Sequence, residues 1–175
     1  MRAHYKSWSG LKKELEGFLC AALRNRVTYF LTYYHQVHNS YGRASIRVDG
    51  KDRIIFSWRE QDKQEWESAE AYKSPGNSKS YSAVIEELSG QWDANCTYSE
   101  ADFIKAVQQY LNMPIEEAHS SDNSIIKILA ILDRRTGRRT IERLNESQEF
   151  LSSPEWAQIF YKLRFEVEEI STDRN

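Results

Sequence analysis

Residues 26–58 read RVTYFLTYYHQVHNSYGRASIRVDGKDRIIFSW, and side-chain character alternates along three runs of this segment. The first run, 26–36, carries β-branched and aromatic residues on both sides, which predicts a strand that is central or well covered. The second run, 43–48, alternates apolar and polar residues and predicts a half-exposed strand. The Asp-Gly pair at 49–50 tolerates a positive φ, as a tight hairpin turn requires, and the third run, 54–58, alternates again. Together these runs predict a three-stranded antiparallel meander.

The sequence predicts helices on both sides of this meander. Apolar residues between Ser9 and Leu23 recur every three or four positions, which indicates an amphipathic helix. From Ser99 onward every segment has helical spacing, and the pattern between these parts is loose. We therefore expect a single α+β domain over residues 1–175, with the sheet in about 1–60, a loose middle in about 60–98 and a helical part in about 99–170.

Local signals add detail to the loose and helical parts. Residues 60–72 fit either a helix or an extension of the last strand, 74–78 fit a loop, and 82–88 fit a short helix. A helix that opens near Ser120 should end at Arg134 and Arg135, with Gly137 in the left-handed conformation that closes a helix. A short helix should follow over 138–144, and Pro154 should introduce a last helix.

Composition limits the class of protein. Lysine and arginine number 24 and aspartate and glutamate 26, so the formal charge is −2, and 40% of the residues are hydrophobic. Such a chain has enough apolar surface to fold, and any binding of nucleic acid must use a local patch. The N-terminus lacks the apolar segment of a secretory signal, and the apolar run 125–132 is too short to cross a bilayer, so we expect a cytoplasmic protein with no membrane association. Cys20 and Cys96 have no metal or disulfide spacing, and we expect Cys20 in the core.

The strongest candidate for a binding site is a cluster of arginines. Residues 133–140 read DRRTGRRT, with Lys127 upstream and Arg143 downstream. We call six residues the arginine corner: Arg134, Arg135, Arg138, Arg139, Lys127 and Arg143. Guanidinium groups match carboxylate or phosphate edges in pairs, so the corner is a candidate partner-binding site. The alternative is structural: the arginines cap a helix end and pair with Asp133, Glu142, Glu146 and Glu149.

Signals of catalysis, metals or cofactors are weak. His35 and His38 are three residues apart, a spacing that fixes no metal geometry, and His4 and His119 have no ligand pattern near them. The sequence contains neither a nucleophile elbow nor a glycine-rich phosphate loop. We therefore expect no catalytic residues, no metal and no cofactor.

Aromatic residues in or near the meander support a nucleic-acid alternative. The candidates for base stacking are Tyr29, Tyr33, Tyr34, Tyr41, Trp58 and Trp66. The order helix, three strands, helix also resembles the double-stranded RNA-binding module, but the basic turn that this module carries on its last helix is missing after Trp58. Packing in the core explains the same aromatics more simply.

Two sets of motifs resemble the ends of an uncharacterised family of short bacterial cytoplasmic proteins. The first set is WSGLKK at 8–13, FLC at 18–20, RV at 26–27, GR at 42–43 and VDGK at 48–51; the second is SDNSIIKILAILDRRTGRRT at 121–140. The resemblance implies an intracellular bacterial protein whose arginine corner belongs to the family pattern. It implies no reaction, cofactor or catalytic residue.

These observations favour a non-enzymatic binding protein. We expect recognition of another protein, in an immunity-like or adaptor role, through the arginine corner and adjacent exposed aromatics. Binding of nucleic acid through the same arginines and the sheet aromatics is the alternative, and an enzyme of unknown reaction is the third possibility. The sequence leaves the oligomeric state open.

Overall fold

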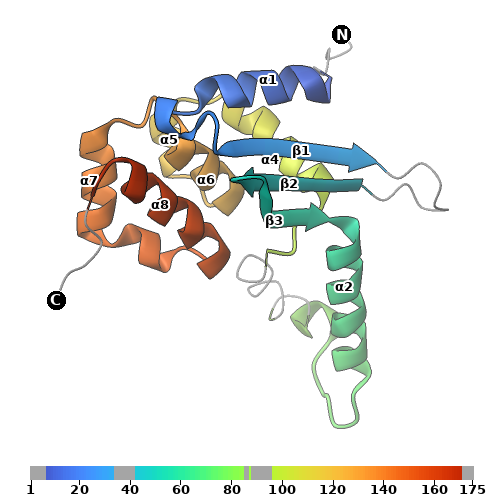
Figure 1. The fold of residues 1–175 in the computed structure, drawn as a ribbon. Coiled ribbons are helices and arrows are strands. Elements are labelled where there is room, and N and C mark those ends of the chain that lie inside the picture. Colours follow the sequence, from blue (N-terminus) through green and yellow to red (C-terminus); the bar gives the residue numbers. More distant parts are fainter. Residues whose placement is uncertain (1–6, 34–41, 85–86, 88–95, 171–175) are drawn as a thin grey trace.

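The computed structural model describes residues 7–33, 42–84, 87 and 96–170 (Figure 1). The elements in chain order are helix α1 (Trp8–Phe18), the 3-10 turn η1 (Ala21–Leu23), strands β1 (Val27–Tyr33), β2 (Gly42–Val48) and β3 (Lys51–Ser57), helices α2 (Trp58–Lys73), α4 (Glu100–Leu111), α5 (Ile115–His119), α6 (Ser124–Leu132) and α7 (Arg138–Ser147), the 3-10 turn η2 (Glu149–Ser152) and helix α8 (Glu155–Val167). The predicted α+β class is confirmed: one helix, a three-stranded antiparallel sheet, and then a mostly helical half.

The sheet has the order β1-β2-β3, so β2 is central and β1 lies at an edge. The central position considered for the first strand is therefore wrong, as is half exposure of the second, where even Ser45 is buried. The polar face of β2 is less exposed than predicted because side chains of the sheet cover it. The Arg47 guanidinium lies 4.0 Å from the Phe30 ring centroid, and Ser45 donates a hydrogen bond of 2.7 Å to Asp52. The expected hairpin is present, with positive φ at both turn residues, 49 and 50.

Helices cover the face of the sheet that lies opposite the side chains of Ser45 and Arg47. α1 packs against β1, α4 packs against β2 and β3, and α6 lies between α4 and α8 (Figure 1). Helix α6 has the sequence SIIKILAIL, and all of its residues except Lys127 are buried. A helix that is apolar on nearly all sides belongs in the middle of a helical layer, which is where α6 lies.

The first helix is shorter than predicted. It ends at Phe18 instead of continuing to Leu23, and Leu19 forms an isolated antiparallel bridge with Asp133. The Cys20 amide donates to the Leu132 carbonyl at 3.2 Å, and the Arg134 amide donates to the Phe18 carbonyl at 2.8 Å. The backbone leaves the helix after Phe18 because the Phe18 carbonyl and the Cys20 amide form hydrogen bonds with the backbone at the end of α6. Cys20 is buried, as expected.

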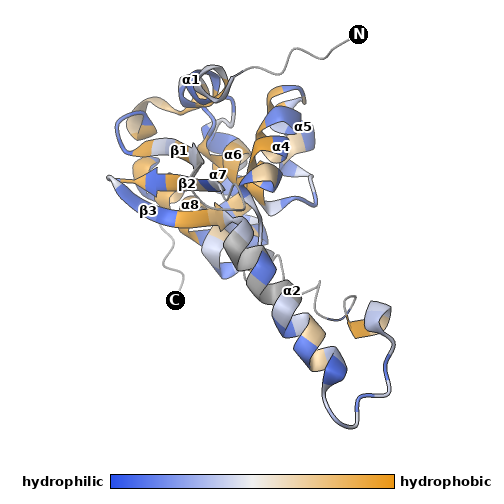
Figure 2. Ribbon diagram, turned by 90° about the vertical axis from the view of Figure 1, so that its right-hand side faces the viewer, coloured by the Kyte–Doolittle hydropathy of each residue, from blue (hydrophilic) through white to orange (hydrophobic). Residues whose placement is uncertain are grey.

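The middle of the chain begins with a helix. β3 ends at Ser57, and Trp58 opens α2, which projects from the β3 edge away from the other elements (Figure 2). Gly76, with φ of 88°, turns the chain within the predicted loop. Within the helix expected at 82–88, residues 82–84 and 87 are helical and the others lie outside the described residues; Tyr81, one residue earlier, is helical as well.

A buried carboxylate holds the start of α2. The Glu100 Oε1 atom accepts a hydrogen bond of 3.0 Å from the Gly42 amide, and its Oε2 atom accepts one of 3.2 Å from the Trp58 amide. A Cβ atom at residue 42 would lie 2.5 Å from Glu100 Cγ. Glycine at this position therefore lets the β2 backbone approach the carboxylate.

Candidate functional site

The arginine corner surrounds the turn between α6 and α7. Helix α6 ends at Leu132, earlier than predicted, and α7 begins at Arg138 with Gly137 as its N-cap. Gly137 has φ of −73°, so the expected left-handed conformation is wrong. The turn leaves α6 early because Asp133 has extended backbone and pairs with Leu19.

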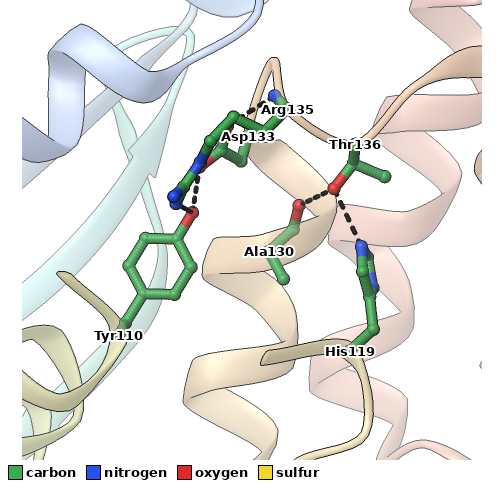
Figure 3. Close-up of polar contacts among 6 residues, drawn as sticks. All are labelled: Tyr110, His119, Ala130, Asp133, Arg135 and Thr136. Carbon is green, nitrogen blue, oxygen red and sulfur yellow. Dashed lines mark hydrogen bonds and ion pairs between the residues drawn. The ribbon is translucent and has the colours of Figure 1, made fainter. Parts of the chain in front are cut away.

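Asp133 fixes this turn from the inside (Figure 3). Its side chain is fully buried, and it accepts hydrogen bonds from the Tyr110 hydroxyl, from Arg135 Nε at 2.9 Å and from the Arg135 amide at 2.6 Å. Arg135 also lies over the Phe18 ring, with Cζ 4.2 Å from the centroid. Burial and the hydrogen bond to Asp133 raise the pKa of Tyr110, and the hydrogen bond to Asp133 raises the pKa of Arg135. Arg135 thus joins α1, α4 and the turn.

The other members of the arginine corner face solvent or lie on α6. Arg138 pairs with Glu142 at 2.8 Å, one helical turn away, in an exposed ion pair. Arg134, Arg139 and Arg143 are exposed and have no acidic partner within the described ranges. Lys127 is half-buried in the first half of α6, roughly 9 Å before the turn at 1.5 Å of rise per residue. Of the four acidic neighbours considered, only Asp133 and Glu142 form ion pairs with the corner.

A cavity of about 250 Å³ opens beside the corner. It is lined by Ile115, Glu116, His119, Ser120, Arg135, Thr136, Thr140 and Arg143. α5 and the residue after it supply one wall, and the turn and α7 supply the other. The cavity therefore joins two arginines of the corner to polar residues that the sequence analysis did not select.

The protonation of His119 follows from its neighbours (Figure 3). The Thr136 hydroxyl donates a hydrogen bond of 2.6 Å to the Ala130 carbonyl, so its oxygen accepts from His119 Nε2 at 2.8 Å. This assignment places the neutral imidazole proton on Nε2 and leaves Nδ1 as an acceptor. Burial, together with the positive charge of Arg143, lowers the pKa of His119, so the ring is neutral at pH 7.

Helix α8 supports the same turn. Arg164 is buried, and its Nη2 atom donates a hydrogen bond of 3.0 Å to the Thr136 carbonyl and pairs with Glu168 at 2.9 Å. The sequence carried a signal for this residue, because Arg164 interrupts the core-facing row of Phe160, Leu163 and Val167. A charged residue on a buried helix face indicates a partner elsewhere in the fold.

The sheet aromatics lie in two different environments. Tyr29 and Phe56 are buried in the core, whereas Trp58 and Trp66 are exposed on α2, Trp66 by 68%. Figure 1 shows α2 at the end of the sheet away from α7, so these two exposed tryptophans do not lie adjacent to the arginine corner. The side chain of Tyr33 is not described, and Tyr34, Tyr41, His4, His35 and His38 lie outside the described residues.

Within the described residues, no group of three or more potential ligands is placed to hold a metal ion, and no helix has the length and apolar character to cross a membrane.

Comparison with known proteins assigns the family. Neither the curated proteins nor the solved structures give a match to this chain. The model of the SF0329 protein family, a family of unknown function, matches residues 7–165. This range includes the sheet, the arginine corner and nearly all of α8, which confirms the predicted link to an uncharacterised family. The chain belongs to the SF0329 protein family.

Proposed function

We propose that this protein is a non-enzymatic, cytoplasmic bacterial binding protein that recognises an acidic segment of another protein through the arginine corner. An immunity-like or adaptor role fits this activity. The observation that carries the proposal is the uneven pairing of the arginines. Arg135 is held by Asp133, whereas Arg134, Arg139 and Arg143 have no acidic partner in the described part of the chain.

The rigid base of the corner supports this role. Contacts from α1, α4 and α8 fix the turn, so the backbone that carries the exposed arginines loses little freedom when a partner binds. Helix α7 also begins without a side-chain cap, which leaves amide donors near the guanidinium groups. Carboxylates are the protein groups that match this set of donors.

Two alternatives use parts of the same surface. Nucleic acid would meet the same arginines but not the buried sheet aromatics, so its contacts would be mainly to phosphates. An enzyme would use the cavity, where Glu116 and His119 lie beside two arginines. We favour protein recognition because His119 already binds Thr136 and because the exposed positive groups lie on a fixed surface.

Site-specific photocrosslinking tests the proposal. A photoreactive residue replaces Arg139, or Arg24 as an exposed control, and crosslinks form in the native cell. We expect a discrete adduct from position 139 only, one that is lost on protease treatment of the partner and survives nuclease treatment. The adduct should weaken when Arg134 and Arg143 become alanine, and persist when Lys13 and Lys105 do.

Salt dependence separates the alternatives. Phosphate neutralisation makes nucleic-acid affinity fall steeply with salt, whereas a mixed protein interface responds less. A nuclease-sensitive adduct would refute protein recognition and favour nucleic acid. Equal adducts from positions 139 and 24 would refute the corner as the site.

A further inference from the structure

We infer that the cavity beside the arginine corner binds a phosphate monoester. This inference goes beyond the proposed function and does not need it, because the cavity can hold a free small ligand or a phosphorylated side chain of a partner. The shared chemistry is a tetrahedral dianion on a single ester oxygen.

The donors that line the cavity come from different sides. Arg143 and Thr140 belong to α7, and Arg135 comes from the turn. The Nε and Nη2 atoms of Arg135 bind Asp133 and Tyr110, and Nη1 has no hydrogen-bond partner among the described residues, so it remains a donor for a ligand. Opposite them lies His119, from α5, whose Nδ1 atom becomes a donor for a ligand when the ring takes up a proton. Donors on several sides suit the three terminal oxygens of a phosphate better than the two coplanar oxygens of a carboxylate.

The size of the cavity limits the ligand. A volume of about 250 Å³ equals that of roughly eight water molecules at ~30 Å³ each. Pockets for drug-sized ligands begin at about 300 Å³, so this cavity fits a phosphate group with a short attachment. A folded nucleotide or a longer chain would extend outside.

Glu116 and His119, in the wall of the cavity, make the binding of an anion depend on their own charge. Glu116 lines the cavity and repels an anion, and it forms no ion pair with Arg143 within the described ranges. The charged groups that act on His119 are Arg143, Asp133, Glu116 and Glu149. A bound dianion adds negative charge, so it raises the pKa of His119 from its lowered value and favours uptake of a proton.

The test is a titration of the full chain with inorganic phosphate, followed by calorimetry and by the imidazole signals of His119 in NMR. We expect saturable binding with a Kd of about 1 mM or tighter. Arg143→Gln should weaken binding tenfold or more, and Glu116→Gln should tighten it several-fold. The matched control Arg139→Gln removes the same charge from the same helix outside the cavity lining and should change the Kd less than twofold.

Several results would overturn the inference. They are absence of saturation, equal weakening by Arg139→Gln and Arg143→Gln, and His119 signals that do not respond to phosphate. A phosphoserine peptide, compared with its unphosphorylated form, then identifies the source: tighter binding than phosphate alone assigns a phosphorylated partner, and equal binding assigns a small ligand. Phosphate binding without a crosslinked partner would remove the proposed function alone, and a crosslinked partner without phosphate binding would remove this inference alone.

Discussion

Replacement of Arg135 by alanine separates the structural part of the arginine corner from the exposed part. The change removes the hydrogen bond from Nε to Asp133, the ion-pair contact of Nη2 with Asp133 at 2.7 Å and the contact of the guanidinium with Phe18. It leaves a fully buried carboxylate without a counter-ion. Removal of one partner from a buried ion pair costs about 3–5 kcal/mol. The Arg135 side chain is 34% exposed, and Tyr110 still donates to Asp133. We therefore expect a smaller loss, about 2–3 kcal/mol in the free energy of unfolding.

Urea denaturation followed by circular dichroism measures this loss. With an m-value of about 2 kcal/mol/M, the midpoint should fall by about 1–1.5 M. The control Arg139→Ala, at an exposed position without a partner among the described residues, should stay within about 0.5 kcal/mol of the wild type. Asp133→Asn in the Arg135→Ala background removes the unpaired charge and should recover about 1 kcal/mol. A midpoint for Arg135→Ala equal to that of Arg139→Ala would refute the structural role of Arg135.

Three further changes test other parts of the structure. Gly42→Ala should cost about 2 kcal/mol of stability in the wild type, because the new Cβ would lie 2.5 Å from Glu100 Cγ. In a Glu100→Ala background the same change should cost under about 0.5 kcal/mol, and equal costs in urea denaturation would contradict the close approach. The lowered pKa of His119, caused mainly by burial, means that the unfolded chain takes up a proton first, so wild-type stability should fall as the pH drops below about 6.5. His119→Gln, which keeps a donor for Thr136, should lose this slope in urea titrations, and an unchanged slope would assign it to another group. Burial opposes ionisation of Asp52, but hydrogen bonds and positive charges from β2 outweigh it and lower its pKa to about 2. The Asp52 carboxylate stabilises the fold at pH values above its pKa in the unfolded chain, about 3.9, and loses this effect as the pH falls through about 2. In thermal melts, Asp52→Asn should therefore cost about 1 kcal/mol at pH 7, after solvent screening, and almost nothing near pH 2.

The meander was predictable because its signals are local. Alternation with period two and an Asp-Gly turn appear within a few residues of each other, and both were confirmed. The strand order and the cover of the sheet were not predictable in the same way. Phe30 made both sides of β1 look apolar, yet its ring is covered by the guanidinium of Arg47 on the neighbouring strand. A sequence read one segment at a time does not reveal that a charged side chain will cover an aromatic ring.

The candidate site, like the sheet, was predictable only where its signals are local in the sequence. The cluster at 134–139 was visible because its members are close in sequence. Which of these arginines the fold holds and which it leaves exposed depends on residues that are distant in the sequence. Tyr110 lies 23 residues from Asp133, and Thr136 lies 17 from His119. The early end of α1 also depends on this turn, through the backbone bridge between Leu19 and Asp133. The hydrogen bonds of that bridge join residues more than 100 positions apart, so the sequence did not indicate where α1 ends.

The distribution of ion pairs is the reason why we propose this cluster as a binding site and not only as a helix end. Acidic residues outnumber basic ones in the chain, 26 to 24, so counter-ions are not scarce. At the sheet, Arg26 pairs with Asp49 and Glu166, and two arginines of β2 share Asp52. At the corner, three arginines within ten residues have no such partner in the described part of the chain. Their mutual repulsion costs little while water and salt screen them, but a partner that excludes water strengthens every charge contact it makes. An unneutralised cluster on a rigid turn thus costs the free protein little and favours an anionic partner strongly, which is the balance that a recognition surface needs.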